Sequence, residues 1–105
     1  MVNMGSSHRI SAVRHELTAL KELLREGDEP KIIAAITGLS WDATLRPAIN
    51  EYLIDIATDR NNSLNVRRHS VMAIDDPKAL LTIMEVGVDP KIISQARIGL
   101  ATYLD

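Results

Sequence analysis

The strongest periodic pattern of apolar residues lies between residues 8 and 26. Steps of three and four separate the apolar positions Ile10, Val13, Leu17, Leu20 and Leu24. Such steps place side chains along one stripe of an α-helix. Because the stripe covers only about two heptads, and sustained coiled coils show about three or four, we expect it to pack within its own domain. The alternative is a seam shared with a second copy of the chain, which would make the protein a homo-oligomer.

Helix start signals divide the remaining sequence into five further helices. The expected helices cover residues 31–37, 45–58, 64–74, 77–85 and 90–104. Ser63, Asp76 and Asp89 stand at N-cap positions, where a side-chain oxygen accepts a hydrogen bond from the first turn. Pro77 and Pro90 follow at the first helical position, where the missing N–H of proline costs nothing.

Residues that favour turns separate these helices. Gly27 and Asp28 end the first helix, and Thr44 can cap the helix over residues 45–58. Gly87 is expected to end the helix over residues 77–85 in the left-handed conformation. No segment alternates between apolar and polar residues for long enough to predict a strand. The pattern therefore predicts an all-α fold of about six helices.

We expect a single all-α domain over residues 8–105, because a chain of 105 residues fits one domain. The run Met4–His8 resembles the opening of an expression tag, so residues 1–7 are expected to be a disordered or tag-like N-terminus. The residues predicted to form a common core are Val66, Val71, Ile74, Leu80, Ile83, Ile92, Ala96 and Leu100.

The amino-acid composition narrows the range of possible functions more than the range of possible folds. Hydrophobic residues make up 46% and charged residues 25%, an ordinary globular mixture. The net charge of −2 argues against a protein coated in basic residues for nucleic acid. The absence of Cys excludes disulfides and Cys-ligated zinc and fits a reducing compartment. No apolar run approaches the roughly 20 residues that span a bilayer, and no secretory signal opens the chain. We therefore expect a cytoplasmic protein without a membrane partner.

Short segments of the chain repeat one another. Glu29–Ile33 is nearly restated as Asp89–Ile93, and Asp76–Lys78 is a third, partial copy. In each copy an acidic residue and a proline precede a lysine, which is the pattern of a capped helix start. Repetition of a helix start favours an architecture of stacked helical units.

Residues 65–74, NVRRHSVMAI, resemble the inner helix of HEAT and armadillo-like repeats. Val66 and Arg67 match the Val-Arg pair of that family, Ser70 matches its small residue, and Ala73 with Ile74 matches its Ala-Leu pair. The resemblance covers about residues 29–104. It implies HEAT-like stacked helices with the first helix as an N-terminal cap, and a protein that binds other proteins through a helical face.

The sequence departs from the repeat pattern in two places. Ile33 and Ile93 occupy the position that Arg67 fills in the best copy. From Ile32 to Val66 is 34 residues and from Val66 to Ile92 is 26, both below the period of HEAT arrays, which is about 40.

Candidate catalytic and metal-binding residues are sparse. The histidines, none of which lies three or four residues from another, are His8, His15 and His69. Glu51, Asp55 and Asp59 share one helical face, which could hold a divalent cation or two acid–base carboxylates. A solvated acidic face is the favoured interpretation, because no nucleophile or base is interleaved. No phosphate loop or nucleophile elbow appears, so we expect neither an enzyme nor a cofactor.

The candidate partner-binding residues are Arg60, Arg68, His69, Lys78 and Trp41. Four of them belong, with Arg67, to the one basic concentration in the chain, and Trp41 is the one large aromatic residue. Packing in the core is the favoured role for Trp41, and an interface is the alternative.

Arg67 and Arg68 are expected to play different roles. The family resemblance implies that Arg67 is structural, so we expect it to bind Asp59, Asp75 or Asp76 within the chain. Arg68 has no such role and is the better candidate for a surface contact.

These observations predict a non-catalytic protein–protein interaction module: an adaptor, inhibitor or assembly component. Nucleic-acid binding through the surface between Arg60 and Lys78 is the alternative. HEAT-like repeats also build an alkylpurine glycosylase, but that family relies on aromatic residues, and this chain holds one Trp and two Tyr.

Overall fold

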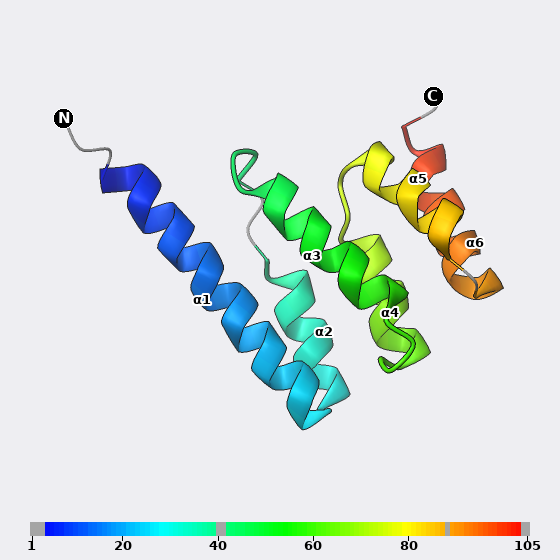
Figure 1. The fold of residues 1–105 in the computed structure, drawn as a ribbon, viewed down its shortest axis with the longest axis horizontal. Helices are drawn as coiled ribbons and strands as arrows, with labels where there is room; N and C mark the ends of the chain where they lie inside the picture. The colour runs from blue at the N-terminus through cyan, green and yellow to red at the C-terminus, as the bar shows by residue number, and fades with distance from the viewer. Residues whose placement is uncertain (1–3, 40–41, 88, 104–105) are drawn as a thin grey trace. The chain divides into compact units, whose positions relative to one another are not determined.

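The computed structural model describes residues 4–39, 42–87 and 89–103, with side chains from residue 14 onward. This part of the chain holds six helices and no strand, which confirms the predicted all-α fold (Figure 1). The helices are α1 (Met4–Glu26), α2 (Glu29–Thr37), α3 (Arg46–Thr58), α4 (Leu64–Met72), α5 (Pro77–Val86) and α6 (Pro90–Ala101).

The helix boundaries differ from the predicted ones at six ends, by one or two residues at four of them and by three or four residues at the start of α1 and the end of α6. α1 begins at Met4, so residues 4–7, which were expected to be disordered or tag-like, belong to the helix. Extending an existing helix costs much less than starting one, and a long amphipathic helix can therefore carry weak helix formers at its end. α4 ends at Met72 rather than residue 74, because Asp76 must adopt extended backbone to cap α5. α6 ends at Ala101 rather than residue 104.

The predicted N-caps are confirmed. The Ser63 hydroxyl accepts a hydrogen bond from the Val66 N–H at 3.2 Å, and Asp76 and Asp89 cap α5 and α6 in the same way. Asp28 is a fourth cap, on α2. Each cap satisfies one of the N–H groups that a helix start leaves without a partner.

The start of α3 is organised differently from the prediction. The carboxylate of Asp42, rather than Thr44, accepts a hydrogen bond, and its donor is the Thr44 N–H at 2.9 Å. The Asp42 carbonyl oxygen also accepts from the N–H groups of Leu45 and Arg46. Asp42 therefore closes the turn that leads into α3, the role that the sequence assigned to Thr44.

Two glycines end helices for different reasons. Gly27 has a φ of +79°, the left-handed conformation that glycine adopts at low cost. Gly87 was predicted to be left-handed, but its φ of −69° and ψ of 137° are extended. Glycine is required at this position because there is no room for a side chain: a Cβ atom would lie 2.5 Å from the carbonyl oxygen of Ile83.

The backbone groups into two compact units, residues 1–49 and 50–105, and the division falls within α3. The predicted single domain over residues 8–105 stays a prediction.

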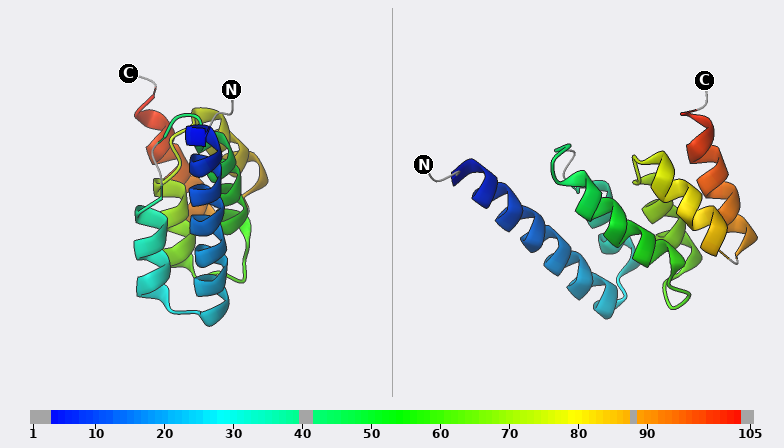
Figure 2. Two further views of the ribbon diagram at one scale, coloured as in Figure 1. Left: turned by 90° about the vertical axis from the view of Figure 1, so that its left-hand side faces the viewer. Right: turned by 45° about the horizontal axis from the view of Figure 1, so that its top comes forward.

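In the first unit, α1 and α2 pack as an antiparallel pair (Figures 1 and 2). Leu20 of the predicted stripe is fully buried, while Leu17 and Leu24 are half-buried. The side chains of Ile10 and Val13 lie outside the described part.

The second unit contains the surface considered below. α4 and α6 run in the same direction and α5 runs in the opposite one (Figures 1 and 2). α6 packs against both α4 and α5. Seven of the eight predicted core residues are buried, and Leu100 is half-buried. The buried apolar residues of this unit are Leu53, Ile56, Ala57, Val66, Val71, Ile74, Ala79, Leu80, Ile83, Ile92 and Ala96.

Candidate partner-binding surface

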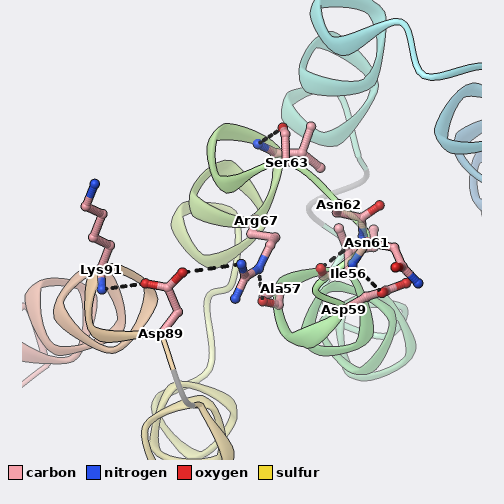
Figure 3. Close-up of polar contacts among 10 residues, drawn as sticks. Ile56, Ala57, Asp59, Asn61, Asn62, Ser63, Arg67, Asp89 and Lys91 are labelled. Atoms are coloured by element: carbon pink, nitrogen blue, oxygen red, sulfur yellow. Dashed lines mark hydrogen bonds and ion pairs between the residues drawn. The ribbon is translucent and has the colours of Figure 1, made fainter.

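Arg67 is buried and ties three helices together. It is 8% exposed. Its Nε donates to the Ala57 carbonyl oxygen of α3 at 3.1 Å, and its guanidinium lies 3.4 Å from an Asp89 carboxylate oxygen at the start of α6 (Figure 3). The intramolecular role predicted for Arg67 is therefore present, but its acidic partner is Asp89.

The three expected acidic partners are engaged elsewhere. The Asp59 carboxylate accepts from the Asn61 N–H at 2.9 Å within its own turn (Figure 3). The Asp75 carboxylate accepts from the Asn50 side-chain amide at 2.8 Å. Asp76 caps α5. Each of these carboxylates thus accepts a hydrogen bond from a group other than Arg67.

Asp89 has two roles because its two carboxylate oxygens face different groups. Oδ1 accepts from the Lys91 N–H at 2.9 Å and caps α6, while Oδ2 faces Arg67 (Figure 3). The cap fixes the carboxylate, and the fixed carboxylate compensates a buried cation. Removing Asp89 would leave the buried Arg67 guanidinium without its counter-charge, which is destabilising.

Two hollows lie on the surface next to this pair. The first has a volume of about 420 Å³ and is lined by Arg60, Arg67, Asp89 and Pro90. The second has a volume of about 350 Å³ and is lined by Arg68, Pro90, Lys91, Ser94, Gln95 and Ile98. Pro90 borders both hollows, so they adjoin at the first residue of α6.

The structure brings two of the five predicted site residues to these hollows. Arg60 borders the first hollow and Arg68 the second, and both are exposed. His69 is half-buried, and its Nδ1 lies 2.8 Å from the Asn65 carbonyl oxygen one turn earlier. Lys78 is exposed on α5 and borders neither hollow. Trp41 lies outside the described residues.

The residues of α6 that line the second hollow were not predicted from the sequence. Lys91, Ser94, Gln95 and Ile98 follow one another at steps of three, one and three, which places them along one face of the helix. That spacing was visible in the sequence, but the buried residues Ile92 and Ala96 dominate the apolar pattern of α6. We name the combined surface of Arg68, Lys91, Ser94, Gln95 and Ile98 the α4–α6 face.

Large apolar side chains are exposed in the second unit. They are Met72, Leu81, Val86, Ile98 and Tyr103. Ile98, which is 61% exposed, lies on the α4–α6 face itself. Met72, also 61% exposed, lies one helical turn after Arg68 on the same side of α4. The α4–α6 face therefore combines cationic and apolar side chains.

The acidic residues of α3 do not form a metal site in the described part of the chain. Glu51, Asp55 and Asp59 are exposed, and no group of three potential metal-ligating side chains gathers among the described residues. Burial, and to a smaller degree the nearby Asp55 carboxylate, raises the pKa of Tyr52 above its usual value. None of these residues lines either hollow.

Comparison of the chain with protein-family models, curated proteins and solved structures finds no match. Among the described residues, none of the helices has the length and apolar character that crossing a membrane requires.

Proposed function

We propose that the chain is a non-catalytic protein-binding module, such as an adaptor, inhibitor or assembly component, and that it holds its partner through the α4–α6 face. The observation that carries the proposal is Ile98, an exposed apolar side chain in a hollow bordered by the cations Arg68 and Lys91. Protein interfaces combine an apolar anchor with a polar rim in this way.

Two further features support the proposal. Exposed apolar side chains that gather on one surface mark interaction sites more often than isolated ones do. The sequence resemblance to HEAT-like repeats also favours a binding role, although a fold supports function only by analogy. Residence in the cytoplasm and self-association through the Ile10–Leu24 stripe remain predictions.

Nucleic-acid binding is the second candidate, and the exposed cations Arg60 and Arg68 favour it. Two features count against it. No aromatic side chain on which a base could stack lines either hollow in the described part of the chain. The net charge of −2 also gives the whole chain no attraction for a polyanion.

Affinity capture with three forms of the chain tests the proposal. The forms are the wild type, Ile98→Asp and Leu81→Asp, used on extract of the native host with and without nuclease treatment. Leu81 is a matched control, because it is an exposed apolar residue of the same unit that lies on α5 and borders neither hollow. We expect a protein that the wild type and Leu81→Asp retain equally and that Ile98→Asp loses, with all three forms equally helical by circular dichroism.

Two results would count against the protein-binding module. One is that all three forms retain the same proteins in the same amounts. The other is that retention depends on intact nucleic acid and disappears after nuclease treatment, which would favour the second candidate.

A further inference from the structure

The cations of the α4–α6 face and its neighbouring hollow are available to a ligand. Arg60, Arg68 and Lys91 are exposed, and within the described part of the chain none of their side chains forms an ion pair. Arg67 differs, because Asp89 lies 3.4 Å from its guanidinium and compensates its charge. The surface thus offers three available positive charges beside one neutral pair.

The charges and the apolar residue occupy different ends of the surface. Arg68 and Lys91 border the second hollow from neighbouring helices that run in the same direction (Figures 1 and 2). Ile98 borders the same hollow from two turns further along α6. The seven residues from Lys91 to Ile98 advance the helix by about 10 Å, at about 1.5 Å per residue. An extended chain covers that distance in about three residues.

From this arrangement we infer that the α4–α6 face recognises an acidic protein segment with one apolar side chain about three residues from its carboxylates. The carboxylates would lie against Arg68 and Lys91, with Arg60 within reach of further acidic residues. The apolar side chain would cover Ile98. This inference rests on the proposed protein-binding function and adds the chemical class of the partner.

A phosphate backbone fits the same surface less well. Single-stranded nucleic acids are held by basic grooves with aromatic side chains on which bases stack. The described residues that line the two hollows include no aromatic side chain. An apolar side chain as exposed as Ile98 also has no favourable role against phosphates, whereas it can anchor a peptide.

Fluorescence anisotropy with defined peptides tests the inference. The probe is a labelled peptide rich in Glu with one Leu three positions after a Glu pair. One comparison peptide has Gln in place of each Glu, and another has Gly in place of Leu. A labelled single-stranded oligothymidine is the nucleic-acid probe. We expect the acidic Leu peptide to bind more tightly than both comparison peptides and the oligonucleotide at physiological ionic strength.

Variants of the full chain assign the binding to this surface. Arg68→Ala should weaken binding of the acidic peptide by roughly two- to five-fold, the effect of losing one exposed ion pair. Ile98→Ala should weaken it by roughly five-fold or more, the effect of losing an interface anchor. The matched controls are Arg97→Ala and Leu81→Ala, because both residues are exposed and neither borders the hollows. Neither control should change the affinity.

Other outcomes would overturn the inference, and they separate it from the proposed function. Equal binding of the Glu and Gln peptides would exclude an acidic partner. Equal weakening by Arg97→Ala and Arg68→Ala would show that the acidic peptide is not held by the α4–α6 face. If capture still depended on Ile98, the protein-binding function would stand and only the partner class would be wrong. Preference for the oligonucleotide over every peptide, together with capture that does not depend on Ile98, would overturn both.

Discussion

Space, rather than an unusual backbone angle, requires glycine at position 87. The φ of −69° suits any residue, but an added Cβ atom would lie 2.5 Å from the Ile83 carbonyl oxygen and 3.1 Å from Ile93 Cγ1. The Gly87 N–H also donates to that Ile83 carbonyl at 2.7 Å, so the close approach is part of the end of α5. The chain can turn from α5 into α6 only because no side chain occupies this point.

Gly87→Ala is therefore expected to destabilise the second unit. Forcing an extra carbon into an occupied space typically costs about 1–3 kcal/mol, and urea denaturation measures that loss through the midpoint. Gly38→Ala is the control, because its nearest contact would be 3.4 Å and its φ of −88° is ordinary. At such a compatible site alanine reduces the entropy of the unfolded chain and is neutral or slightly stabilising. Equal midpoints for the two variants would contradict this account of Gly87.

Residue roles could be predicted from the sequence where they depend on near neighbours. Ser63, Asp76 and Asp89 accept hydrogen bonds from N–H groups two or three residues later, so local sequence is sufficient to identify them. The partner of Arg67 lies 22 residues away and is brought close by packing of α6 on α4. Nothing in the local sequence distinguishes Asp89 from three nearer carboxylates. The structural role of Arg67 was therefore predictable, and its acidic partner was not.

At the scale of elements, a small residue allows α5 and α6 to approach closely. A Cβ atom at Gly99 of α6 would lie 3.3 Å from Leu80 Cδ1 of α5, so the Leu80 side chain packs directly over the α6 backbone. Leu80 is 1% exposed, while its neighbour Leu81 is 45% exposed. The two leucines therefore lie on different sides of α5, one buried and one exposed.

Leu80→Ala is expected to lower the free energy of unfolding by about 2–5 kcal/mol, because a buried leucine loses its contacts and leaves a cavity. The same substitution at Leu81 should change stability by less than about 0.5 kcal/mol, as at most surface sites. Chemical denaturation of both variants under the same conditions gives the comparison. Losses of similar size would mean that α5 does not present Leu80 to α6.

The helices α4, α5 and α6 were predictable because each has its own start signal, but their outward faces were not. Periodicity identified Ile92 and Ala96 as core residues of α6, and both are buried. Ile98 has the same chemical character and is exposed, because no helix of the second unit covers that side. An apolar stripe shows that a helix packs against something, but only the tertiary arrangement shows which apolar residues remain for a partner.

At the scale of the whole molecule, net charge and local charge have opposite signs. The chain carries −2 overall, yet Arg60, Arg68 and Lys91 are exposed around two adjoining hollows. Long-range attraction follows the whole charge distribution, whereas contact specificity follows the local one. We therefore expect such a surface to select short acidic segments without attracting polyanions from a distance.

Salt dependence separates these two kinds of binding. A ligand that neutralises phosphates gives a log–log slope of affinity against salt of roughly −0.7 to −0.9 for each phosphate contacted. We expect only weak, non-specific retention of single-stranded or duplex DNA at physiological salt. The reason is that the net charge is negative and no aromatic side chain among the described residues lines either hollow. Filter binding or anisotropy across a salt series measures the slope. Tight binding with a steep slope, which Arg68→Ala reduces by about one contact while Arg97→Ala does not, would instead establish the α4–α6 face as a nucleic-acid surface.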